Sequence, residues 1–158
     1  SCLNDVAVIV LSNKKGKYIG AKTGWLSVGI DGWGFNNAGD TQITQLGYPV
    51  GIDYGIQMQR NDALAEIWDG TFSFNTLMGT QMNEGSSGGP WVTNFGVPGY
   101  PNGVFPGNNP SPNVITGITS WGYANSPVLV AGSSPLTSGN IGYLLSLACS
   151  SFPAACAP

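Results

Sequence analysis

Short segments in which polar and apolar residues alternate, separated by turn residues, constrain the fold of this chain more than any other feature. Alternation with a period of two gives a strand one apolar face, and several such strands at short spacing are typical of a closed antiparallel barrel. Four such segments follow one another, at residues 41–46, 56–60, 63–68 and 71–74. Residues 91–92 and 114–121 also have strand character. We therefore predict an all-β protein.

The N-terminal run 6–11 has a different pattern, because all of its residues are apolar and most are β-branched. Such an unbroken run predicts a strand that is buried on both faces. Asp5 stands directly before it, where it is either a turn residue at the strand entry or a functional carboxylate.

The composition excludes several classes of function. Only 8% of the residues are charged and the net charge is -3, so the chain has no basic surface for nucleic acid. Its longest apolar run, 6–11, is far shorter than a membrane-spanning helix. The sequence has no Cys/His cluster suited to zinc, no phosphate-binding loop and no carboxylate pair in the setting of a glycosidase site. We therefore expect no metal, cofactor, nucleic acid or membrane partner.

Residues 82–91 pack small, flexible residues around two hydroxyl groups, in the order MNEGSSGGPW. Gly85, Gly88 and Gly89 permit backbone angles that a Cβ forbids, so successive N–H groups can converge beside a serine side chain. Fixed N–H donors at such a point stabilise the oxyanion that forms when a hydroxyl attacks a carbonyl. Taken alone, the segment is more simply interpreted as a Gly/Ser turn between two strands.

Three segments together carry a family resemblance. Residues 85–90 (GSSGGP) resemble the Gly-x-Ser-Gly-Gly-Pro signature of chymotrypsin-like serine peptidases. Residues 117–122 (GITSWG) resemble the strand whose backbone pairs with the bound peptide in that family, and residues 4–11 (NDVAVIVL) resemble the strand that supplies its catalytic aspartate. All three occur in the order that the family has. Further short matches, at residues 19–25, 46–49 and 72–76, resemble the glutamyl-endopeptidase branch.

The resemblance implies a chymotrypsin-like double antiparallel β-barrel. Residues 1–38 would then form the end of the first barrel and the crossing between barrels, and residues 39–158 the complete second barrel. Within the second barrel, residues 139–148 resemble the last strand of the family, which runs into a short C-terminal helix.

The resemblance also implies roles for individual residues. It makes Ser87 the nucleophile, Asp5 the carboxylate that orients a histidine, and the N–H groups of Gly85 and Ser87 the oxyanion site. One wall of the primary specificity pocket would come from Gln81 and Met82. The remaining substrate-binding residues would be those of the downstream strand: Thr119, Ser120, Trp121 and Gly122.

The chain contains no histidine, although the family needs an imidazole to take the serine proton and return it to the leaving group. In the family that histidine precedes the aspartate, and this sequence begins four residues before Asp5. We therefore expect a serine endopeptidase whose histidine comes from a separate light chain. The alternative is a relative that has lost catalysis and binds peptides or proteins; a β-rich structural protein with a chance serine loop is a weaker third.

The three cysteines leave one without an internal partner. Cys149 and Cys156 are close in sequence and are the favoured pair. Cys2 then either bridges to the light chain or remains a buried or free thiol, and the sequence supports both equally. An acidic, lysine-poor chain with disulfides favours a secreted, extracellular protein.

The implied pocket carries no carboxylate at the position that trypsin-like enzymes use to bind Lys and Arg, so basic specificity is not supported. Thr119 and Ser120 stand in the strand where acid-selective members of the branch have a histidine. We therefore expect uncharged side chains as the substrate class. Hydroxyls and amides leave recognition of an acidic or amide side chain open.

Overall fold

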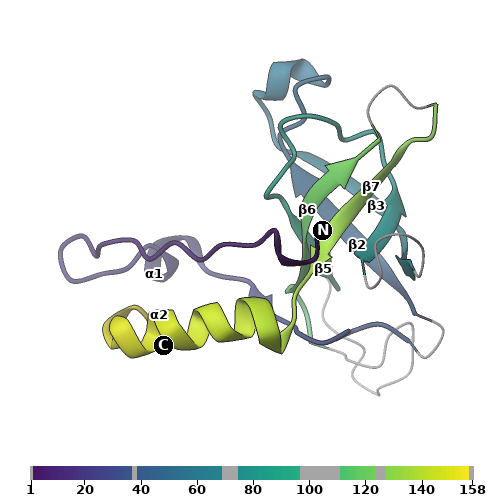
Figure 1. The fold of residues 1–158 in the computed structure, drawn as a ribbon. Coiled ribbons are helices and arrows are strands. Elements are labelled where there is room, and N and C mark those ends of the chain that lie inside the picture. Colours follow the sequence, from purple (N-terminus) through teal and green to yellow (C-terminus); the bar gives the residue numbers. More distant parts are fainter. Residues whose placement is uncertain (1, 37–38, 69–74, 97–110, 124–126, 157–158) are drawn as a thin grey trace.

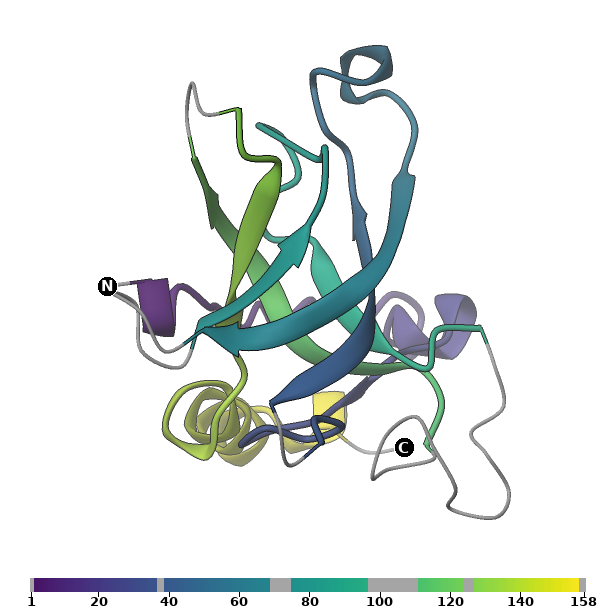
Figure 2. The same cartoon turned by 90° about the vertical axis from the view of Figure 1, so that its right-hand side faces the viewer.

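The structure is a computed structural model and describes residues 2–36, 39–68, 75–96, 111–123 and 127–156. Its centre is a closed antiparallel barrel (Figures 1 and 2). The strands that close the ring are β2 (Asp40–Gly47), β3 (Gln59–Trp68), β4 (Asn75–Gly79), β5 (Pro90–Thr93), β6 (Val114–Gly122) and β7 (Val130–Pro135). Around the ring they follow the order β2, β3, β4, β7, β6, β5, and β5 pairs back with β2. A short strand, β1 (Ser27–Val28), adds to β6 in parallel. The predicted all-β barrel is confirmed.

Alternation along the strands places the core inside the ring. Ile43 and Ala65 are 0% exposed, and the large Trp91 is 1% exposed between them and Met78. A closed ring gives most of each strand a neighbour on both sides, although β6 extends beyond its pairing with β5. The barrel therefore provides a rigid frame for the loops at its ends.

Helices lie mainly at the two ends of the chain. They are η1 (Cys2–Asn4), α1 (Gly20–Thr23), η2 (Asp53–Gly55), η3 (Ser138–Gly142), α2 (Tyr143–Ser151) and α3 (Pro153–Cys156). Thr137 and Asn140 form a capping box at the start of η3, which fixes where helix replaces strand. The disulfide joins Cys149 to Cys156, the pair that sequence proximity favoured, whereas Cys2 is a half-buried free thiol. Among the helices that the structure describes, none has the length and apolar character needed to cross a membrane.

The predicted buried strand at residues 6–11 is wrong. The segment is extended without strand pairing, and Ile9 and Leu11 are 81% and 50% exposed. A strand buried on both faces needs neighbours on both edges, and the described residues supply none there. Instead the segment leaves the barrel and continues to α1, on the same side of the molecule as α2 (Figure 1).

Several predicted strand boundaries also differ. Residues 56–60 and 63–68 were expected as two strands, but β3 runs continuously from Gln59 to Trp68 because β2 pairs with it along its whole length. The expected strand 71–74 lies outside the described residues. The last strand is β7, before rather than within 139–148, and that later segment is helical. The division of the chain at residues 38 and 39 stays a prediction.

Candidate active site

The glycine-rich loop 85–89 lies at the entrance to β5, between the end of β2 and strand β6. Toward β6, the Gly88 N–H donates to the Thr119 carbonyl at 2.9 Å, and the Thr119 N–H donates to the Gly89 carbonyl at 2.8 Å. Toward β2, a Cβ on Gly89 would lie 2.1 Å from the Leu46 carbonyl oxygen. The loop is therefore clamped on both sides, and only glycine fits at its last position.

The two adjacent serines of the loop have different surroundings. Ser86 is 2% exposed, and its hydroxyl donates to the Asn83 carbonyl. Ser87 is exposed and lines an open groove on the surface. The fold thus exposes one of the two hydroxyls to solvent, and it is the one that the sequence motif predicts as nucleophile.

Two backbone N–H groups beside Ser87 are available as donors. The N–H groups of Ser86, Gly88 and Gly89 are all used inside the loop or toward β6. Within the described part of the chain, no acceptor is bonded to the N–H of Gly85 or of Ser87. Gly85 has a φ of 91°, in the region that L side chains rarely adopt. These are the two groups that the sequence predicted as the oxyanion site.

A β-bulge in β6 positions the candidate aspartate. Thr119 pairs with Ser133 and Trp121 with Gly132, so Ser120 is an extra residue with no partner on β7. Bulges redirect a side chain from the regular ladder. Here the Ser120 hydroxyl donates to Asp5 Oδ2 at 2.7 Å. The sequence predicted a substrate-binding role for Ser120, and the structure adds this side-chain contact with Asp5.

Asp5 is also held through its backbone. Its N–H donates to the Ser134 hydroxyl at 3.2 Å, and that hydroxyl in turn donates to the Cys2 carbonyl. Ser134 is 0% exposed in β7, so the short N-terminal helix is bonded directly to the barrel. Nothing in the sequence of residues 130–135 marked this serine as a support for Asp5.

Adjacent residues of β6 therefore hold the two candidate catalytic groups. The backbone of Thr119 binds the nucleophile loop, while the side chain of Ser120 binds Asp5. Sequence spacing could not show this, because Asp5 and Ser120 are 115 residues apart.

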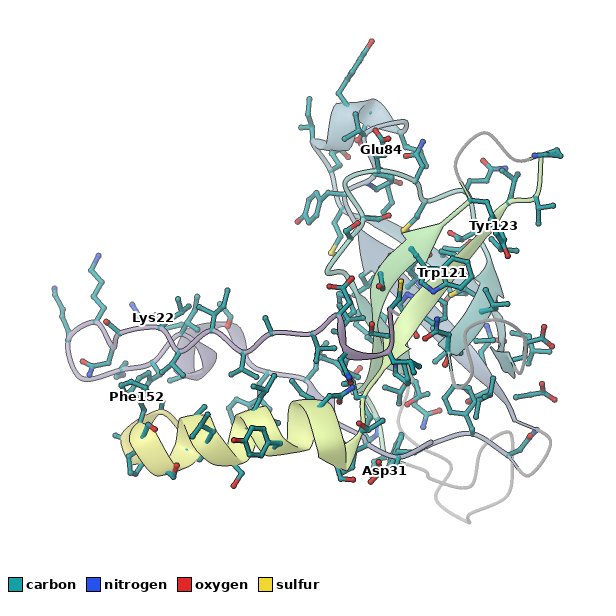
Figure 3. The ribbon with its side chains drawn as sticks, in the orientation of Figure 1. Lys22, Asp31, Glu84, Trp121, Tyr123 and Phe152 are labelled. Carbon is teal, nitrogen blue, oxygen red and sulfur yellow. A yellow bond between two sulfur atoms is a disulfide. The ribbon has the colours of Figure 1, made fainter. Side chains whose placement is uncertain are left out.

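The other predicted substrate-binding residues of β6 are built into the barrel wall. The Thr119 hydroxyl accepts hydrogen bonds from Gln45 Nε2 at 3.1 Å and from Trp91 Nε1 at 2.9 Å. Trp121, labelled in Figure 3, packs over Gly132, where a Cβ would lie 2.0 Å from the indole, and meets the Tyr123 ring edge-on. Gly122 ends the strand and is exposed.

Replacing Thr119 with valine is predicted to destabilise the barrel. Valine has nearly the same shape, but it leaves the buried N–H groups of Gln45 and Trp91 without their acceptor, at a cost of about 2–4 kcal/mol. Thermal and urea unfolding measure this loss. The same change at exposed Thr23 is the control and should alter stability by less than about 0.5 kcal/mol. Equal effects at the two sites would contradict the assignment.

Gln81 and Met82 do not line the groove that contains Ser87. They contribute to a separate open cavity of about 460 Å³, together with Ile52, Gln59, Arg60, Asn61, Gly79, Thr80 and Leu129. In that cavity Arg60 is paired with Asp62, and the hydrogen bond from Arg60 lowers the pKa of that carboxyl group.

The Ser87 groove, of about 310 Å³, is lined by Leu46, Gly47, Tyr48, Met58 and residues 85–90. Tyr48 and Met58 are not among the site residues predicted from the sequence.

Comparison with known proteins is consistent with this architecture. A scan against protein-family models finds no match, and neither does a search of curated proteins. Among solved structures, the chain is similar to a thermostable serine protease from an extremophilic microorganism, with a TM-score of 0.56 and 22% sequence identity. The similarity covers 81% of this chain and 50% of that one, so the chain spans about half the length of the protease that it matches. The barrel formed by the described residues, with its extra strand and short C-terminal helix, has the chymotrypsin-like protease fold.

Proposed function

We propose that this chain is the nucleophile-bearing part of a serine endopeptidase. Ser87 Oγ attacks the peptide carbonyl, the N–H groups of Gly85 and Ser87 stabilise the oxyanion, and the acyl-enzyme that results is hydrolysed by water. One observation carries the proposal. The exposed Ser87 lies beside two available N–H donors, its own and that of Gly85, while Ser120 on the neighbouring strand β6 is bonded to the Asp5 carboxylate.

The proposal requires an imidazole from a polypeptide outside these 158 residues, because the sequence contains no histidine. That imidazole would take the Ser87 proton and deliver it to the leaving amine. Asp5 is suited to orient it, since Ser120 is bonded to Oδ2 and no described residue is bonded to Oδ1. The exposed side chains of Ile9 (81%) and Trp25 (74%) offer an apolar surface that such a companion would cover.

Strand β6 would align the substrate. Its pairing with β5 ends at Ile118, while its pairing with β7 continues to Gly122. An extended peptide can add to such an edge as a further strand. Because no acidic or basic residue lies in segment 119–122, uncharged side chains remain the proposed substrate class. Membership of the glutamyl-endopeptidase branch is proposed on the sequence motifs alone.

The second candidate function is a non-catalytic protein that binds peptides through the same face. The missing histidine favours it, because the fold, the loop and the strand edge all persist without catalysis. Either function fits a protein that acts outside the cell, where a disulfide such as Cys149–Cys156 is maintained.

Reaction with a fluorophosphonate probe distinguishes the two functions. The protein is isolated without reductant, so that any polypeptide bridged through Cys2 is retained and appears in the intact mass. The endopeptidase is expected to incorporate one probe per molecule, at Ser87, as located by peptide mass spectrometry. A protein that is shown to contain a histidine-bearing companion and still fails to react at Ser87 contradicts the endopeptidase and supports the binding protein.

A further inference from the structure

The groove beside Ser87 has apolar side chains on the wall opposite the glycine loop. Tyr48 follows Gly47, the last residue of β2, and Met58 precedes Gln59, the first residue of β3. Because Gly47 pairs with Gln59, continuing that register places Tyr48 and Met58 opposite each other across the hairpin. They are 49% and 54% exposed. None of the groove's lining residues carries a charge. The groove thus offers a small apolar site directly adjoining the candidate nucleophile.

The hairpin that carries Tyr48 and Met58 is fixed to the nucleophile loop. The Val50 N–H donates to the Glu84 carbonyl at 2.7 Å, and the Gly51 N–H donates to Asn83 Oδ1 at 3.2 Å. At its tip, the Asp53 carboxylate accepts from the N–H of Ile56 and from Gln59 Nε2. Figure 2 shows this hairpin extending beyond the barrel, with η2 at its tip. The groove is therefore formed before any ligand enters, which limits the ordering cost of binding.

The groove and the open end of β6 lie on opposite sides of Ser87. Strand β5 pairs with β2 on one side and β6 on the other, and the loop that precedes β5 keeps this order. A peptide whose residues before the scissile bond lie along 120–122 must therefore pass Ser87 toward Tyr48 and Met58. The residues after the scissile bond enter the groove.

We infer that Tyr48 and Met58 form a subsite for a bulky apolar side chain on the leaving-group side of the scissile bond. This inference rests on the proposed endopeptidase function for its direction, and on the groove itself for the class of side chain. A leucine side chain is expected to be preferred over glycine there by at least about tenfold, because apolar pockets discriminate on this scale for each missing group.

The acyl-enzyme provides the kinetic test. An ester substrate acylates Ser87, and added leucinamide or glycinamide competes with water for the acyl group, so the amide products measured by mass spectrometry report the leaving-group side alone. The Tyr48→Ser/Met58→Ser protein should lose the leucinamide preference. The matched control is Tyr54→Ser/Ile56→Ser, which alters side chains that are 88% and 74% exposed on the same hairpin outside the groove, and it should retain the preference. A preference below about twofold in the wild type, or one that survives in the groove variant, overturns the inference.

A binding measurement separates this inference from the proposed function. Met78 and Met82 are 2% and 7% exposed, so in protein labelled with ¹³C at the methionine methyl groups the Met58 signal reports the groove and the other two serve as internal references. Leucinamide should shift the Met58 signal at concentrations where glycinamide does not. In a sample shown to contain the histidine-bearing companion, a selective shift without ester turnover would overturn the endopeptidase while supporting the apolar site. Absence of a shift overturns the site, whatever the turnover.

Discussion

Ser87→Ala is expected to abolish fluorophosphonate labelling and to lower kcat by about 10⁴- to 10⁶-fold, because no other group on the loop can form the acyl bond. Its stability should change by less than about 0.5 kcal/mol, since Ser87 is exposed and its side chain supports no described contact. Parallel measurement of kcat and of urea unfolding tests both statements. The large kinetic effect without a structural one is what identifies a nucleophile.

The adjacent serine is the matched control for that experiment. Ser86→Ala removes a buried hydroxyl that donates to the Asn83 carbonyl, and should cost about 1 kcal/mol of stability. Labelling at Ser87 should persist. If labelling is lost in Ser86→Ala and kept in Ser87→Ala, the assignment of the nucleophile is wrong.

Gly85→Ala is expected to damage both folding and catalysis. A Cβ at this position would lie 2.5 Å from the Tyr48 carbonyl oxygen, and the backbone has a φ of 91°. Overpacking and the unfavourable backbone conformation together should cost about 2–5 kcal/mol. Because relief of the clash moves one of the two oxyanion donors, kcat should fall by at least about 10²-fold in the protein that remains folded.

Gly88 isolates the conformational part of this effect. Its φ of 81° is similar, yet a Cβ there would meet nothing within 4 Å. Gly88→Ala should therefore cost only the conformational term, about 1–2 kcal/mol. Thermal unfolding and probe labelling of both variants test this difference. Equal losses of stability and of labelling in the two variants would show that contact with Tyr48 does not position the loop.

The sequence predicted the barrel where local periodicity and pairing agree. Residues 41–46 mix apolar with polar residues and form most of β2, where Ile43 and Gln45 are both 0% exposed. The run 6–11 was misjudged because hydrophobicity alone does not supply neighbouring strands. The strand at residues 130–135 was not predicted because these residues are mostly small; they form β7 because β4 and β6 pair with them on either side, and Gly132 leaves room for the indole of Trp121.

The sequence predicted those parts of the candidate site whose residues are contiguous in the chain. The loop around Ser87 is such a motif, since its glycines meet steric demands within a few residues. By contrast, the Ser120–Asp5 hydrogen bond depends on a bulge, and the groove depends on Tyr48 and Met58 meeting across a hairpin. Strand register and bulges arise from pairing between strands that are distant in sequence, so a local sequence pattern does not predict them.

Because Ser120 is the extra residue of the bulge in β6, the support of Asp5 depends on the number of residues in that strand. Deleting Ser120 would bring β6 and β7 into uninterrupted register, but it would leave Asp5 without its hydroxyl partner. The pairing of β6 with β7 therefore does not use Ser120, whereas the contact with Asp5 depends on it. The bulge that interrupts the ladder between β6 and β7 is the feature that directs the Ser120 hydroxyl to Asp5.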